Sequence, residues 1–124
     1  MATIHIDHDA VVIKPTRFEK IAGLVGEQRV PLSSIVDVTV EDAPHRAIRG
    51  LRAPGLAVPG STKIGTWRDG GRRVFVCVRD SKPAVRIETA GRDAAGGRYD
   101  GFIVTSDDPR AIADHIDAAR PQRS

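Results

Sequence analysis

The sequence predicts one small, mostly β domain that closes with an amphipathic helix. Glycine and proline punctuate the chain, with 12 Gly and 8 Pro in 124 residues, while aromatic residues make up only 4%. The core must therefore consist mainly of aliphatic side chains, many of them β-branched, which favour short strands. The length and the 40% hydrophobic content suit one core. We expect a single domain over residues 1–124, with its core at 3–119 and a frayed polar tail at 120–124.

The first elements are predicted to be a hairpin and a short helix. Ile4 and Ile6 alternate with polar residues, and the chain then turns into an apolar run at 11–13. Thr16 and Glu19 match a capping box, in which each side chain accepts a hydrogen bond from a free backbone N–H at a helix start. Apolar residues at helical spacing follow, so we expect a helix near residues 17–25.

The middle of the chain combines strand patterns with a turn-rich stretch. Alternating valines predict a strand at 36–40. Residues 50–60 contain two Pro-Gly steps, which predict an ordered loop of consecutive turns. Residues 64–68 and 73–79 are predicted to form a hairpin. Because both faces of the strand from Val74 to Val78 are apolar, we expect a helix or another subunit to cover its outward face.

Two further strands and a capped helix complete the prediction. The strands are expected at 85–88 and 99–105. Asp107 or Asp108 then caps a helix that has Pro109 at its first position, where the missing proline N–H costs nothing. The apolar stripe of this helix consists of Ile112, Ala113, Ile116 and Ala119.

Cysteine usage and hydropathy indicate the compartment. Cys77 is the single cysteine, which excludes an internal disulfide framework and suits a reducing environment. It lies in an apolar run, where a thiol behaves as a small buried hydrophobe. No signal-peptide pattern or long apolar span is visible. We therefore expect a soluble, cytoplasmic protein.

Motifs for catalysis are weak. The segment from Gly55 to Lys63 resembles a phosphate-binding loop, but Ser61 and Thr62 separate its lysine from the second glycine. A metal site at the first hairpin would use His5, Asp7, His8 and Asp9, although outward polar residues of an edge hairpin give the same pattern. We predict no enzyme, no cofactor and no bound metal.

Positive charge is concentrated in the middle of the chain. Residues 43–79 hold eight bases and one acid, a net charge of +7, whereas the remainder holds 11 bases and 15 acids. This segment is either a solvated face or a surface for an anion or a partner. Few aromatic residues interleave with the bases, which argues against single-stranded nucleic acid. The predicted binding residues are Arg46, Arg49, Arg52, Lys63, Trp67, Arg68, Arg72 and Arg73.

The order of these elements resembles the pleckstrin-homology (PH) superfold, and more narrowly the small bacterial PH-like domain proteins. The resemblance spans about Phe18 to Ala119. It rests on residues 30–36 leading into a strand, on the Gly/Pro motifs at 50–55, 59–60 and 65–68, and on the terminal helix at 107–109. It implies a bent antiparallel barrel of about seven strands, capped by the C-terminal helix. It also implies a non-enzymatic binding or self-assembly module.

Three functional hypotheses follow in order. The first is a non-catalytic binding or scaffolding module for a protein partner or for a second copy of the chain, which makes a homo-oligomer possible. The second is a peripheral binder of an anionic membrane surface, or of another acidic ligand, through the bases of residues 46–79. A metal-dependent enzyme ranks third, because it rests on the hairpin cluster alone.

Overall fold

The structure is a computed structural model that describes residues 2–23, 26–44, 48, 51–58, 62–80, 82–91 and 99–120. The fold is mostly β, as the sequence predicts. In chain order, the described elements are β1 (Thr3–Asp7), β2 (Ala10–Lys14), α1 (Arg17–Gly23), β3 (Gln28–Pro31), the 3-10 helix η1 (Leu32–Ser34), β4 (Ile35–Glu41), β5 (Leu51–Val58), β6 (Thr62–Asp69), β7 (Arg72–Val78), β8 (Ala84–Thr89), β9 (Gly101–Thr105) and α4 (Pro109–Ala119).

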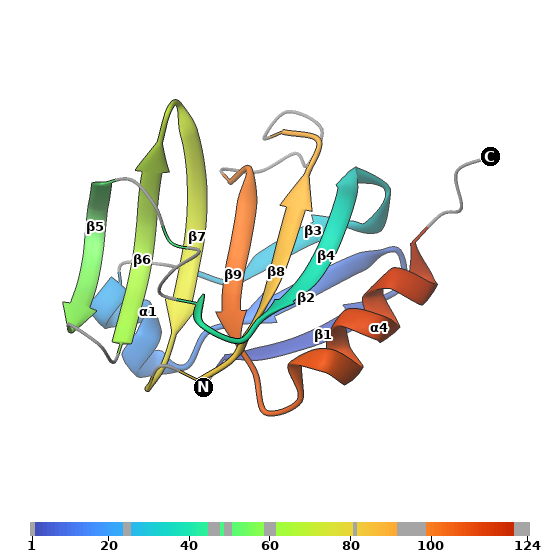
Figure 1. The fold of residues 1–124 in the computed structure, drawn as a ribbon, viewed down its shortest axis with the longest axis horizontal. Coiled ribbons are helices and arrows are strands. Elements are labelled where there is room, and N and C mark those ends of the chain that lie inside the picture. Colours follow the sequence, from blue (N-terminus) through green and yellow to red (C-terminus); the bar gives the residue numbers. More distant parts are fainter. Residues whose placement is uncertain are drawn as a thin grey trace.

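The strands form two sheets, one behind the other (Figure 1). The first is antiparallel and has the order β1-β2-β3. Its β1–β2 hairpin has a two-residue loop, His8-Asp9, and pairs Asp7 with Ala10. His8 takes a φ of 57°, in keeping with the positive φ that tight hairpin loops require.

The second sheet has the order β4-β8-β9-β7-β6-β5. All its pairs are antiparallel except β7–β9, which is parallel. The described strands therefore form two sheets and no closed barrel, whereas the sequence predicted an antiparallel barrel of about seven strands. The difference arises because β9 inserts between β7 and β8, which follow one another in the chain. Strand alternation shows which face is buried but does not specify such a long-range pairing.

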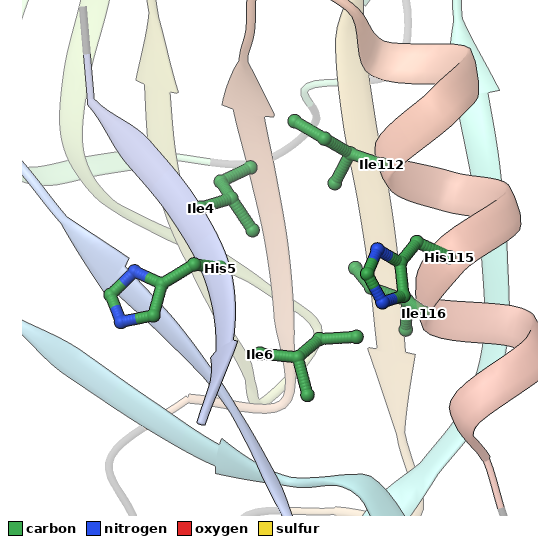
Figure 2. Close-up of a pocket in the computed structure, with 6 residues that line it drawn as sticks. All are labelled: Ile4, His5, Ile6, Ile112, His115 and Ile116. Atoms are coloured by element: carbon green, nitrogen blue, oxygen red, sulfur yellow. The ribbon is translucent and has the colours of Figure 1, made fainter. Parts of the chain in front are cut away.

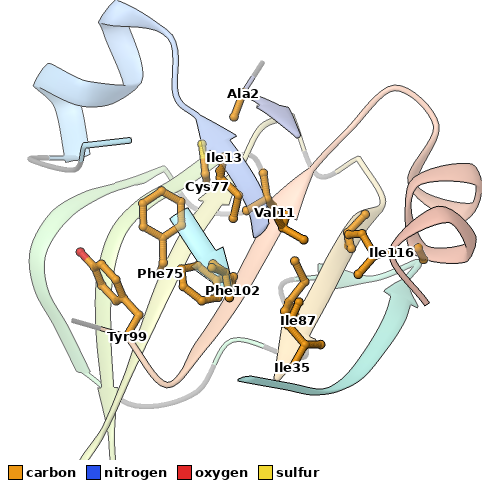
Figure 3. Close-up of a cluster of buried hydrophobic side chains, with 14 of the residues drawn as sticks. Ala2, Val11, Ile13, Ile35, Phe75, Cys77, Ile87, Tyr99, Phe102 and Ile116 are labelled. Carbon is orange, nitrogen blue, oxygen red and sulfur yellow. The ribbon is translucent and has the colours of Figure 1, made fainter. Parts of the chain in front are cut away.

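The main core lies between the two sheets and beneath α4 (Figure 3). Phe75 is fully buried, and its ring centroid lies 5.3 Å from that of Tyr99 and 5.8 Å from that of Phe102. The Tyr99 hydroxyl shares a hydrogen bond of 3.0 Å with the Thr66 hydroxyl, so its polar end is satisfied inside the core. Aliphatic side chains from β2, β8 and α4 fill the remaining space.

A smaller apolar cluster lies on the opposite face of the six-stranded sheet. It consists of Trp67, Val76, Val78, Ala84 and Ile103, with Ile48, Ala57 and Val74 packed against it. The expectation that both faces of β7 are buried is therefore met. Among the described residues, the cover includes Ile48 of the β4–β5 connection, and Trp67 of the neighbouring strand packs beside it; cover by a helix or a second subunit stays a prediction.

Helices α1 and α4 begin with the predicted caps. Glu19 accepts a 2.8 Å hydrogen bond from the Thr16 N–H, and Thr16 accepts one of 3.2 Å from the Glu19 N–H, which completes the capping box of α1. Asp108, not Asp107, caps α4 by accepting a hydrogen bond from the Ala111 N–H. The helix predicted near 17–25 occupies 17–23, and residues 24 and 25 lie outside the described part.

The turn-rich segment at 50–60 differs from its prediction. Residues 51–58 form strand β5 at the edge of the six-stranded sheet, and no run of turns is present there. The pairing of β5 with β6 shifts register between Arg52 and Gly55, around Pro54. An edge strand with an irregular register accommodates proline, because one of its sides needs no N–H donors. Residues 59 and 60 lie outside the described part.

Candidate functional site

The predicted binding residues that the structure describes do not come together on one surface. Arg46 and Arg49 lie outside the described part, as does the side chain of Arg52. Trp67 is only 4% exposed and packs in the smaller apolar cluster. The indole is therefore a core residue, and it is not accessible as a stacking platform for a ligand.

The predicted arginines of the β6–β7 hairpin divide between the two faces of the sheet. Arg68 and Arg73 are direct partners across the hairpin, while Arg72 is opposite Asp69. Because successive side chains of a strand point to opposite faces, Arg72 and Arg73 point away from each other. Lys63 lies at the far end of the same hairpin, opposite Val78, and is half-buried. These bases therefore do not form one anion-binding surface.

Arg72 instead belongs to a ladder of charges across β7, β8 and β4. Its guanidinium pairs with Glu88, Arg86 bonds the same Glu88 through Nε at 3.0 Å, and Arg86 Nη1 reaches Glu41 at 3.4 Å. Partial burial lowers the pKa of Arg86, but the two carboxylates more than offset this, so the pKa lies above its ordinary value. The ladder satisfies its own charges and offers a ligand little.

Gly101 is what allows Arg72 to reach Glu88. Strand β9 lies between β7 and β8, and Gly101 pairs with Glu88 on one side and Val74 on the other. A Cβ atom at Gly101 would lie 3.2 Å from Arg72 Nη2 and 3.4 Å from the Glu88 carboxylate oxygens. The missing side chain leaves the gap through which the guanidinium crosses β9.

A buried carboxylate connects α1 to the end of β7. The side chain of Glu19 is 0% exposed, and its Oε2 lies 3.1 Å from Nη1 of Arg79. Burial raises the pKa of Glu19, but the Thr16 N–H, the Cys77 thiol and Arg79 all bond the carboxylate, so the pKa lies below its ordinary value. The sequence indicated the capping role of Glu19 but not its burial, which depends on Arg79, 60 residues away.

Cys77 lies beside this carboxylate and is buried, as the sequence predicted. Burial raises the pKa of the Cys77 thiol far above its ordinary value, and the nearby Glu19 raises it further. The thiolate is the nucleophilic form, so the raised pKa disfavours the reactive form of this thiol at neutral pH.

The first hairpin uses its acidic residues in ion pairs. Arg29 Nη1 lies 3.1 Å from Asp7 and Arg29 Nη2 lies 3.8 Å from Asp9. The hydrogen bond from Arg29 lowers the pKa of Asp7. His8 lies 3.6 Å from Asp7. No group of three or more histidine, cysteine or acidic side chains suited to a metal ion is found among the described residues.

A pocket opens between β1 and α4 (Figure 2). It has a volume of about 240 Å³ and is lined by Ile4, His5, Ile6, Ile112, His115 and Ile116. Ile4 and Ile6 point towards α4, where Ile112 and Ile116 face them, while the His5 ring points to the other side of β1 (Figure 2). Four isoleucines therefore give the pocket an apolar lining, with His115 at its side.

Strand β1 differs from the other sheet edges. Proline lies in edge strands β3 and β5, and the pairing of β4 and of β5 shifts register. Arg120 also covers the start of β4 by donating a 3.0 Å hydrogen bond to the Val36 carbonyl. Such features hinder pairing with another chain. In contrast, β1 pairs with β2 in one unbroken register and contains no proline.

Searches against known protein families, curated proteins and solved structures found no match to this chain. None of the described helices has the length and apolar character needed to cross a membrane.

Proposed function

We propose that this chain is a non-catalytic protein-binding module that takes an extended segment of its partner onto the free edge of β1. The observation that carries the proposal is the combination of a regular strand edge, with which no described strand pairs, and an apolar pocket directly beside it. Strand addition uses these two parts: main-chain hydrogen bonds give affinity, and a pocket for alternate side chains gives specificity.

The hairpin geometry directs some backbone N–H and C=O groups of β1 away from β2, as strand addition requires. In a two-residue hairpin, the residues that flank the loop exchange both of their backbone hydrogen bonds, which here applies to Asp7 and Ala10. The pattern alternates along the strand, so His5 and Thr3 also bond β2. The N–H and C=O groups of Ile4 and Ile6 then point to the free edge, where a partner strand can pair with them.

The pocket supports the choice of partner side chains. Its apolar lining suits an aliphatic or aromatic side chain, because burial of apolar surface is favourable while an unpaired charge there is costly. The partner segment is therefore expected to alternate apolar and polar residues. A second copy of this chain is one such partner, since β1 itself has the alternating sequence TIHID.

The remaining hypotheses have less support. An anionic ligand bound through residues 46–79 is disfavoured by the burial of Trp67 and by the pairing of Arg72 with Glu88. The resemblance to PH-like proteins and a cytoplasmic location stay predictions. The two-sheet arrangement with its parallel β7–β9 pair lends no support to the PH-like barrel.

Selection from a phage-displayed library of peptides with alternating polar and apolar residues tests the proposal. We expect selected peptides to slow amide hydrogen exchange at Ile4 and Ile6. Ile112→Glu should weaken binding by about tenfold or more, because it places a charge beside the bound apolar side chain. Ile6→Pro, which removes an outward N–H, should also weaken it. Phe18→Ser, at the opposite end of the molecule, is the control and should bind normally.

Sedimentation velocity separates a foreign partner from self-association. If the partner is a second copy, the wild-type chain forms dimers that Ile6→Pro abolishes. If no peptide is enriched and the chain is monomeric, or if Ile112→Glu binds selected peptides as tightly as the wild type, the proposal is wrong.

A further inference from the structure

Phe18 is an exposed aromatic side chain at the start of α1. It is 54% exposed, and Val36 is the other exposed large hydrophobic residue in the described part of the chain. The guanidinium carbon of Arg79 lies 5.0 Å from the centroid of the Phe18 ring. This cation–π contact holds the ring in place while leaving about half of the side chain in water.

Basic residues surround Phe18 along the chain. Lys14, Arg17 and Lys20 are all exposed. Glu19, the acidic residue in this stretch, is fully buried and paired with Arg79, so it contributes no exposed negative charge. Asp80, next to Arg79, is an exposed acid at this end of the molecule. Residues 14–20 therefore present an aromatic ring and positive charges to solvent.

The helical geometry explains why three of these side chains, those of Arg17, Phe18 and Lys20, lie on the half of α1 that faces away from Glu19. Successive residues of an α-helix are rotated by about 100°. With Glu19 directed inward, Arg17 lies on the outward side, while Phe18 and Lys20 flank it on either side. The burial of one carboxylate thus directs one aromatic and two basic side chains outward.

We infer that this surface, formed by Lys14, Arg17, Phe18 and Lys20, docks on an anionic lipid bilayer. An aromatic ring surrounded by bases suits a membrane interface, because the ring enters the apolar boundary while the bases remain among the anionic headgroups. Charge complementarity supports a lipid surface with acidic headgroups. The membrane-facing surface is thus a different one from the basic segment 46–79 that the sequence analysis named.

The inferred surface is separate from the site on β1. Figure 1 shows α1 and α4 at opposite ends of the molecule. A module that docks through α1 therefore keeps the β1 edge accessible, and the chain is able to hold a protein partner at a membrane. Neither proposal depends on the other, because peptide binding is measured without lipid and lipid binding without peptide.

Co-sedimentation with large vesicles tests the inference. We expect the protein to bind vesicles of phosphatidylcholine mixed with phosphatidylserine, and to be released by salt. The double variant Arg17→Gln/Lys20→Gln should reduce the partition coefficient by about 25-fold, at about fivefold for each base. Phe18→Ser should reduce it by about tenfold, whereas Phe18→Leu, which stays apolar, should bind nearly as well as the wild type.

The matched control is Arg68→Gln/Arg73→Gln, which removes the same charge from the β6–β7 hairpin and should change binding little. Thermal melts establish that each variant is folded, and the exposed positions of Arg17 and Lys20 make that pair safe to replace. Equal binding to vesicles of phosphatidylcholine alone, or an equal loss in the Arg68/Arg73 pair, would overturn the inference. Binding to single-stranded DNA but not to vesicles would also contradict it.

Discussion

In the described part of the chain, helices α1 and α4 contact the sheets through different kinds of interaction. At one end, α1 is held by a buried carboxylate, since Glu19 bonds its own helix cap and the guanidinium of Arg79. At the other end, α4 is held by apolar contact of Ala113 and Ile116 with the core. The ion pair of α1 depends on a single partner, Arg79, whereas the apolar contact of α4 is shared among many weak van der Waals interactions.

This difference has a consequence for the surface at each end. Inward-pointing Glu19 leaves Phe18 and its basic neighbours exposed around α1. The apolar stripe of α4 is wider than its contact with the core, so Ile112 remains half-buried and lines the pocket against β1. Each mode of attachment thus leaves a different chemistry exposed: cations with an aromatic ring at α1, and aliphatic surface at α4.

The largest expected effect is at the apolar end. Ile116 is 1% exposed, and Ile116→Ala should reduce the free energy of unfolding by about 3 kcal/mol through lost burial and the cavity that remains. Ile112→Ala is the matched control on the same helix. It should cost about 1 kcal/mol, since part of that side chain is already in water. Urea denaturation measures both, and equal losses would contradict a graded apolar attachment.

The polar end should respond to the loss of one partner. Arg79→Met leaves the Glu19 carboxylate buried without its cation, and we expect a loss of about 2 kcal/mol, less than for a fully buried pair because Arg79 is partly exposed. The double variant Glu19→Met/Arg79→Met should regain much of the loss. A double variant that is as unstable as the single one would show that the carboxylate is not the cause.

The same pair makes a pH-dependent contribution. The pKa of Glu19 is lowered in the folded protein, so its contribution to stability is complete above the ordinary pKa of a glutamate. The contribution is lost as the pH falls through the lowered folded value. Acid titration of urea-unfolding curves should therefore show a loss at low pH that the double variant lacks.

The smallest effect is expected at the N-cap of α4. Asp108→Ala removes the acceptor for the Ala111 N–H and should cost about 1 kcal/mol. Asp107→Ala changes the neighbouring acid without touching this bond and should cost much less. Thermal melts of the two variants measure the difference. Similar effects for both would mean that general charge near the helix start, not the capping bond, stabilises α4.

Local patterns predicted local elements well. The Thr16/Glu19 capping box, the α4 helix after Asp108 and the hairpin at 3–14 all depend on residues within a few positions of one another, so their spacing is visible in the chain. The alternating valines of β4 predicted the buried face of that strand only in part. Val38 and Val40 pack against the core, but Val36 is 38% exposed because the β4–β8 register shifts between Ile35 and Asp37.

The candidate sites were less accessible to sequence reasoning. The predicted basic surface combined residues by their proximity in the chain, and the structure divides Arg72 from Arg73 and buries Trp67. The pocket joins β1 to α4, which are separated by more than one hundred residues. The sequence predicted that Ile4 and Ile6 share one face of a strand and that Ile112 and Ile116 share one face of a helix. It did not indicate that these two faces meet.

The sequence by itself determined the mostly β character, the caps of α1 and α4 and the burial of Cys77, because hydrophobic periodicity and capping act over one or two turns of chain. Only the tertiary structure decided the parallel placement of β9 beside β7, the burial of Glu19 against Arg79 and the place of β1 at the edge of its described sheet. These features depend on which distant segments meet, and that choice is made by the packing of the whole core.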